Sequence, residues 1–128
     1  MIDPDYPAAS WFLIVAPTLF LIVYAIPIFA APFRWARLFR WKVNEGDDLA
    51  LYYGRCLGAL AIAVCLACLR AAPHPRQSVI VFDLIAAAGA LLCGVHIWGA
   101  LAKRQPWIET VEIGLYLGVA VLAVALRP

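Results

Sequence analysis

Charged residues are scarce in this chain, and their scarcity decides its class. Only 14% of the 128 residues are Asp, Glu, Lys or Arg, and 66% are apolar, whereas about 25% of the residues of an average soluble domain are charged. A soluble domain of this length could not bury so much apolar surface, because its ratio of surface to volume is too high. The composition therefore excludes an ordinary soluble domain and predicts a protein whose apolar surface faces lipid.

Strict alternation of apolar and polar residues is also missing, which argues against a membrane-spanning β-barrel. Four long apolar runs are present instead, and a helix needs roughly 20 such residues to cross the hydrocarbon core. Because backbone groups in lipid must be satisfied within each segment, these runs predict helices. The sequence predicts an all-α fold, in which residues 1–128 form one integral membrane bundle of four transmembrane helices. The predicted helices cover residues 10–31, 49–69, 78–102 and 107–126.

Basic residues are missing from the start of the chain, MIDPDYPAAS, which carries two aspartates. A cleaved signal peptide begins with positive charge and has a shorter apolar region, so we expect the first run to be a retained helix. Pro17 and Pro27 lie inside this run. They predict kinks or local breaks, which neighbouring helices can accommodate.

Lys and Arg residues are distributed unevenly between the two ends of the predicted helices. Seven lie at the end that carries the first and third connecting loops, and three lie at the opposite end. Positively charged loops face the cytoplasm, so this distribution predicts that both termini lie on the outer side of the membrane. The seven are Arg34, Arg37, Arg40, Lys42, Arg55, Lys103 and Arg104, and the three are Arg70, Arg76 and Arg127.

The most polar stretch, FRWARLFRWKVNEGDD at residues 33–48, lies between the first two apolar runs. On a helix its arginines occupy one arc, and Trp35, Leu38 and Phe39 occupy the opposite arc. Such a short amphipathic segment suits the lipid interface, where each basic residue contributes about 1 kcal/mol at an anionic surface. Its basic face is too small for nucleic acid, and docking of a partner protein stays open as the alternative. The predicted headgroup-binding residues are Arg34, Arg37, Arg40 and Lys42.

Ionisable residues inside the apolar runs are the best pointers to function, because burying them in hydrocarbon is costly. A helical rise of 1.5 Å per residue places an arginine, a histidine and a glutamate about 7–10 Å inside the same membrane boundary. On the fourth helix, three polar residues share one face by their i, i+3, i+7 spacing. The predicted polar cluster consists of Arg55, His96, Glu109, Glu112 and Tyr116.

This cluster has two interpretations. In the structural one, Arg55 pairs with Glu112, since ionic groups at membrane depth need partners. In the functional one, the cluster is a pocket open to the cytoplasm that binds a headgroup, a quinone-like molecule or another polar ligand. His96 with Glu112 is the one plausible acid–base couple, and no residue is assigned a catalytic role.

Other features predict structure more than chemistry. Asp83 is expected to pair with Arg70 across the hairpin between the second and third helices. Two small-xxx-small pairs, Gly54 with Gly58 and Gly114 with Gly118, indicate close helix packing within the chain or between subunits. No metal or cofactor is assigned, because the Cys and His residues have no spacing typical of a zinc motif.

The second apolar run reads GRCLGALAIAVCLACL and has an arginine near its start. With the four short-looped helices, this segment resembles the DoxX-like small membrane proteins of bacteria. The resemblance covers the topology and this one segment. It implies a bacterial inner membrane location, so that both termini would be periplasmic, and a family whose members mostly lack an assigned activity. Small multidrug transporters have a similar length but rely on a carboxylate in the first helix, which this chain lacks.

The sequence therefore predicts an integral inner-membrane protein without enzymatic activity, either an accessory or scaffold subunit or a protein that binds lipid or a small ligand. The alternative is a small membrane enzyme or transporter that uses the cytoplasmic-side cluster. The expected partners are membrane lipids, together with a larger membrane complex or further copies of the chain, and nucleic acid is excluded.

Overall fold

The computed structural model describes residues 2–128, and it contains helices and no strands over these residues. Four helical segments are long and apolar enough to cross a membrane: Pro7–Ala30, Asp48–Ala71, Pro75–Leu101 and Trp107–Ala125. They confirm the all-α class and the number of candidate spans. Each boundary lies within three residues of the prediction. Four such helices indicate a multi-pass membrane protein.

The first span contains a local break, as its prolines predict. It consists of α1 (Pro7–Phe20), the π-helical turn η1 (Leu21–Ala25) and α2 (Ile26–Ala30). Pro27 has no N–H, so the carbonyl of Val23 has no partner in a regular α-helix. The indole of Trp35 donates a hydrogen bond to this carbonyl at 3.0 Å. The break thus provides an acceptor for the segment that follows.

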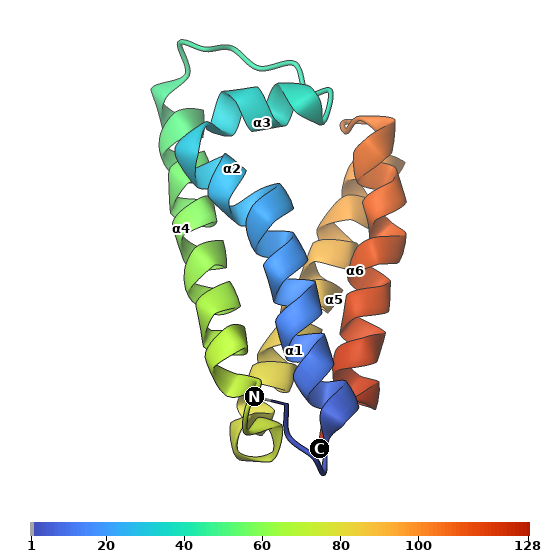
Figure 1. Cartoon of the computed structure of the whole chain (residues 1–128). Coiled ribbons are helices and arrows are strands. Elements are labelled where there is room, and N and C mark those ends of the chain that lie inside the picture. Colours follow the sequence, from blue (N-terminus) through green and yellow to red (C-terminus); the bar gives the residue numbers. More distant parts are fainter. Residues whose placement is uncertain (1) are drawn as a thin grey trace.

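That segment is the short helix α3 (Pro32–Leu38), which lies across one end of the bundle (Figure 1). The amphipathic helix predicted here is present, but its aromatic side chains turn toward the bundle. Trp35 stacks on Phe39 with ring centroids 4.4 Å apart, and Tyr24 of the first span packs against Trp35 at 5.8 Å. The four basic residues of this segment remain exposed: Arg34, Arg37, Arg40 and Lys42.

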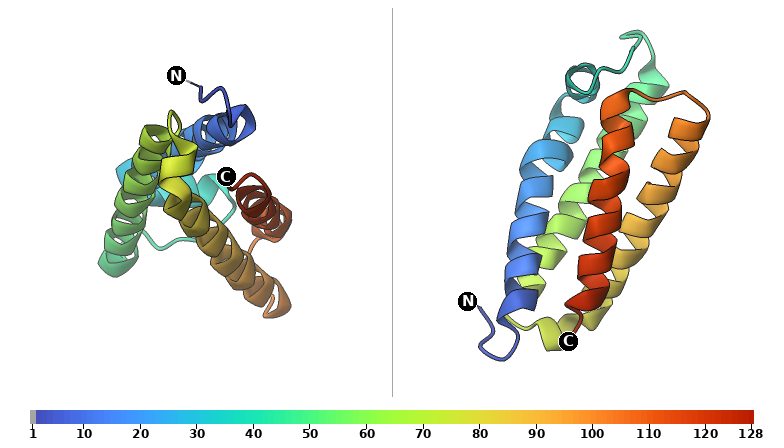
Figure 2. Two further views of the ribbon diagram at one scale, coloured as in Figure 1. Left: turned by 90° about the horizontal axis from the view of Figure 1, so that it is seen from below. Right: turned by 90° about the vertical axis from the view of Figure 1, so that its right-hand side faces the viewer.

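The long helices are arranged as two pairs. The first span packs along α4 (Asp48–Ala71), and α5 (Val79–Leu101) packs along α6 (Trp107–Ala125), whereas contacts between α4 and α5 are sparse. Figure 2 shows the two pairs from one end and from the side. Glycines allow close approach within each pair: Gly58 lies against the backbone of Phe29, and Gly89 lies against Tyr116.

The two pairs meet in an apolar core at the end of the molecule where both termini lie (Figure 1). Phe12 of α1 stacks on Phe82 of α5 with ring centroids 6.1 Å apart. Nearby, the buried hydroxyl of Ser10 donates to the carbonyl of Ala72 at 2.7 Å. The core consists of Ala9, Phe12, Leu13, Cys68, Ala71, Ala72, Phe82 and Ala123.

An ion pair also links the two helices of the second pair, but its partner differs from the predicted one. Arg127 donates to both carboxylate oxygens of Asp83, at 2.7 and 3.2 Å. Arg70, the predicted partner, forms no ion pair with a residue of the described range 2–128. The reason is the helix pairing: α6 runs alongside α5, so the end of α6 reaches Asp83.

Candidate functional site

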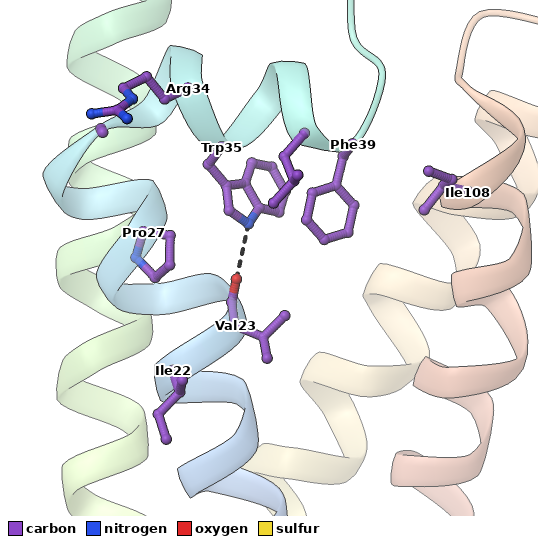
Figure 3. A pocket seen from close by; sticks show the side chains of 9 residues that line it. Ile22, Val23, Pro27, Arg34, Trp35, Phe39 and Ile108 are labelled. Carbon is purple, nitrogen blue, oxygen red and sulfur yellow. Dashed lines mark hydrogen bonds between the residues drawn. The ribbon is translucent and has the colours of Figure 1, made fainter.

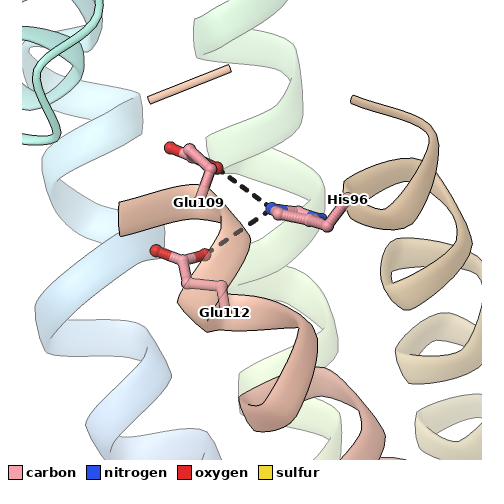
Figure 4. A group of neighbouring side chains, drawn as sticks. All are labelled: His96, Glu109 and Glu112. Atoms are coloured by element: carbon pink, nitrogen blue, oxygen red, sulfur yellow. Dashed lines mark hydrogen bonds and ion pairs between the residues drawn. The ribbon is translucent and has the colours of Figure 1, made fainter. Parts of the chain in front are cut away.

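A polar cluster lies between α5 and α6, near the end of the bundle that α3 covers. His96 of α5 faces Glu109 and Glu112 of α6 (Figure 4). Its Nε2 atom lies 3.0 Å from Oε2 of Glu109 and 3.7 Å from Oε2 of Glu112. The i, i+3 spacing places both carboxylates on one face of α6. All three residues are buried, with 8%, 6% and 6% of their surface exposed.

Each of the three side chains also forms a hydrogen bond with a residue outside the cluster, through the atom that faces away from the other two. Trp41 donates its indole N–H to Oε1 of Glu109 at 2.6 Å, and Tyr24 donates its hydroxyl to Oε1 of Glu112 at 3.1 Å. Nδ1 of His96 lies 2.7 Å from the carbonyl oxygen of Leu92, one turn earlier. The Oε2 atoms and Nε2 are therefore the atoms that remain directed at the centre of the cluster.

Helix-end geometry places Trp41 within reach of the cluster. After α3, Arg40 adopts a left-handed backbone conformation with φ of 66°. The N–H of Arg40 bonds to the carbonyl of Arg37, and that of Trp41 bonds to Ala36. These are the two bonds of a Schellman motif, which ends a helix and turns the chain sharply. The turn brings the indole of Trp41 back to α6.

The loop between α5 and α6 is fixed in the same way. Lys103 is left-handed with φ of 53°, and the N–H of Arg104 bonds to the carbonyl of Gly99. Gln105 then donates to the carbonyl of His96 at 2.9 Å and to the hydroxyl of Thr110 at 3.1 Å. One side chain thus connects the helix that carries the imidazole with the helix that carries the carboxylates.

Of the five residues predicted for the cluster, four lie together. The ring of Tyr116 lies against the His96 ring, with centroids 4.8 Å apart. Arg55 lies elsewhere, in a shallow groove with Arg37 and Glu45 on the far side of the first span. It forms no ion pair with any residue of the described range, so the predicted pair of Arg55 with Glu112 is absent. Arg55 was predicted to belong to the cluster because it lies at a similar depth. However, its helix α4 packs on the first span, away from α6.

Sequence reasoning missed two members of this site, Tyr24 and Trp41. Tyr24 carries a hydrogen-bond donor in an otherwise apolar stretch, and Trp41 carries one between the basic residues Arg40 and Lys42. Tyr24 lies in the half of the first span nearer α3 and Trp41 follows α3, which is the end of the bundle where the carboxylates were predicted. Two buried carboxylates need hydrogen-bond donors. This need could have identified the Tyr and Trp side chains at the same end of the bundle as their partners.

A groove lies beside the cluster, between the first span, α3 and α6. It has a volume of about 610 Å³ and is almost wholly apolar, with Ile22, Pro27, Phe39 and Ile108 among its lining residues (Figure 3). Arg34 is the one charged residue among the residues that line it. Ile108 precedes Glu109 in α6, so the same turn of this helix borders both the groove and the cluster.

Two of the basic residues predicted to bind headgroups have contacts within the chain. Arg37 forms an ion pair with Glu45, and the guanidinium of Arg40 lies over the Trp107 ring, 5.9 Å from its centroid. A cation above an indole is attracted by the negative face of the ring. Arg34 and Lys42 are exposed. Arg34 alone of the four lies at the groove.

Comparisons of this chain with protein-family models, with curated proteins and with solved structures found no match. The resemblance to DoxX-like proteins therefore stays a prediction. Function has to be argued from the cluster and the groove themselves.

Proposed function

We propose that this chain is a multi-pass protein of the bacterial inner membrane that binds an anionic phospholipid in the groove beneath α3, without catalysing a reaction. The observation that carries the proposal is an apolar groove of about 610 Å³ next to an exposed basic helix. It extends the prediction of a lipid-binding or accessory protein by naming where the lipid lies.

The size and lining of the groove suit part of a lipid. Ligand pockets span about 300–1,000 Å³ and are mostly apolar, with few polar groups that fix orientation. The apolar wall formed by Ile22, Phe39 and Ile108 suits an acyl chain. Arg34, at the rim of the groove on the side away from Ile108 (Figure 3), suits a phosphate. A lipid with its headgroup at α3 would place its chain along the spans, as the bilayer requires.

The charge distribution supports binding of anionic lipid from the cytoplasmic leaflet. Seven Lys and Arg residues lie at the α3 end and three at the other, and basic loops face the cytoplasm. Anionic lipids give that leaflet its negative surface potential.

This orientation puts both termini in the periplasm. An alkaline phosphatase fused after Pro128 should then be active, and one inserted within residues 43–46 should be inactive. The reverse pattern would contradict the orientation.

Native mass spectrometry of protein in mild detergent with phosphatidylglycerol tests the lipid site. Arg34→Gln should weaken retention about fivefold, since one charge at an anionic surface contributes about 1 kcal/mol. Ile108→Trp should weaken it too, because the larger ring fills the groove. Arg76→Gln is the matched control, an exposed arginine at the opposite end of the bundle, and should have no effect. Equal retention in all variants would refute the site and favour docking of a protein at α3.

A second candidate, a small transporter, is favoured by one observation. His96 and two carboxylates are buried together inside the spans, and intramembrane ionisable groups often mark ion pathways. Protein in liposomes would then carry protons down an imposed pH gradient, and Glu112→Gln would abolish the flux. Wild-type liposomes that hold the gradient as well as empty ones would exclude this candidate.

A further inference from the structure

We propose that His96, Glu109 and Glu112 form a binding site for one divalent first-row transition metal ion. This site is distinct from the lipid groove, and the proposal does not rest on lipid binding. The proposal stands on the geometry of three ligand atoms, on the charge of the cluster and on the contacts that hold each ligand from outside.

The three ligand atoms have the spacing of a metal site. One nitrogen or oxygen from each residue lies within 4.8 Å of the others. Zinc binds imidazole nitrogen at about 2.0–2.1 Å and carboxylate oxygen at about 2.0–2.2 Å in a tetrahedron, which separates neighbouring ligand atoms by about 3.4 Å. Nε2 of His96 lies 3.0 and 3.7 Å from the two Oε2 atoms. Both separations lie close to the tetrahedral value, so small side-chain rotations would complete the geometry.

The charge of the cluster also calls for a cation. When both are ionised, the two carboxylates carry two negative charges. Arg37 and Arg127 do not balance them, because these arginines pair with Glu45 and Asp83. Within residues 2–128, no Lys or Arg forms an ion pair with Glu109 or Glu112. Buried charge without a partner is expensive. A divalent ion balances both carboxylates, whereas a protonated imidazole balances one.

Hydrogen bonding fixes which ring nitrogen points inward. The carbonyl of Leu92 can only accept, so Nδ1 of His96 carries the hydrogen that lies toward it. In the neutral ring, Nε2 then directs a lone pair at the two Oε2 atoms. Nε2 and the two Oε2 atoms then all direct lone pairs at one point and repel one another. A cation bound at that point would be coordinated by all three atoms. Ligating histidines commonly donate their other N–H to a carbonyl in this way.

The carboxylates are oriented from outside in the same sense. Trp41 and Tyr24 each donate to an Oε1 atom, at 2.6 and 3.1 Å, which leaves each Oε2 for the ion. Such outer contacts are a regular part of metal sites, and losing one typically lowers metal affinity about 10–100-fold. The donors come from the first span and from the segment after α3, so the site would join both helix pairs.

The ligand set decides the class of metal. One imidazole and two carboxylates suit Zn²⁺, Co²⁺, Fe²⁺ or Mn²⁺, whereas Ca²⁺ prefers six to eight oxygen ligands. Cys93 lies one turn before His96, but its thiol donates to the carbonyl of Ile113 at 3.8 Å and is not among the ligands. Three protein ligands leave a fourth position for water or another small ligand.

Cobalt binding tests the proposal directly. Protein purified in mild detergent and stripped with a chelator is titrated with Co²⁺, and the visible absorption of four-coordinate cobalt is followed. We expect one Co²⁺ per chain, displaced by one equivalent of Zn²⁺. His96→Gln and Glu112→Gln should each weaken binding by about 100-fold or more, beyond the effect of an outer contact. Glu45→Gln is the control, because it removes an exposed carboxylate, and should bind as the wild type does.

A further variant keeps the test decisive if a ligand variant fails to fold. Trp41→Phe retains all three ligands and the aromatic ring but removes the donor to Glu109, so it should bind Co²⁺ about 10–100-fold more weakly. Folded wild-type protein that shows no cobalt absorption would overturn the proposal and leave an ion pair with a protonated imidazole. Equal binding by wild type and Trp41→Phe, or by wild type and His96→Gln, would overturn it as well.

Discussion

Gly58 and Gly118 belong to the same kind of sequence pattern, yet the structure predicts opposite effects for Ala at the two positions. A Cβ atom at Gly58 would lie 2.4 Å from the backbone nitrogen of Phe29 and 2.7 Å from its Cα. Backbone atoms cannot rotate away, so α4 and α2 would have to separate. Overpacking costs about 1–3 kcal/mol, and this contact belongs at the upper end. Replacing a helical glycine recovers about 1 kcal/mol, so Gly58→Ala should lose about 2 kcal/mol.

At Gly118 a Cβ atom would meet nothing within 4 Å. Gly118→Ala should therefore gain about 1 kcal/mol of stability from helix propensity without a packing cost. The two variants should differ in the free energy of unfolding by about 3 kcal/mol. Unfolding in mixed micelles, followed by circular dichroism, measures this difference. Gly114→Ala, also in open space, serves as a second control. Equal stability of Gly58→Ala and Gly118→Ala would refute the close packing of α2 on α4.

Two further predictions concern polar contacts. Asp83→Asn and Arg127→Gln should each cost up to about 1 kcal/mol, since the pair is half exposed; a double-mutant cycle in unfolding should show coupling between them and none between Asp83 and Arg70. Trp41→Phe should cost about 1–3 kcal/mol at constant ring packing, because the buried carboxylate of Glu109 loses a donor; unfolding as stable as that of the wild type would contradict the contact.

The four spans could be predicted from the sequence because length and apolarity are sufficient to identify them. Their pairing could not. In lipid, apolar helices have no hydrophobic preference for one partner, and close contacts between small residues decide the arrangement. The sequence offers Gly54 with Gly58 and Gly114 with Gly118 equally, but only the first pair approaches another helix, at Pro32 and Phe29. Asp83 was therefore predicted to pair with Arg70, its neighbour across the hairpin, and not with Arg127 after α6.

The cluster shows the same division between depth and direction. Helical rise fixes how deep a residue lies, and it brought His96 and Glu112 to one level, while the i, i+3 spacing added Glu109. It does not fix the direction in which a helix faces, so Arg55 was included although α4 packs elsewhere. Trp41 was missed for a related reason. Its position depends on the left-handed turn at Arg40, which no glycine marks in the sequence.

The two ends of the molecule hold the helix pairs together by different means. At the end with the termini, apolar packing such as Phe12 on Phe82 joins them. At the α3 end, hydrogen bonds from Tyr24 and Trp41 reach the carboxylates of α6 across the gap between the pairs. An ion bound to those carboxylates would fix α6 against both donors. Since Ile108 of α6 also lines the groove, metal binding would hold one wall of the lipid site in place.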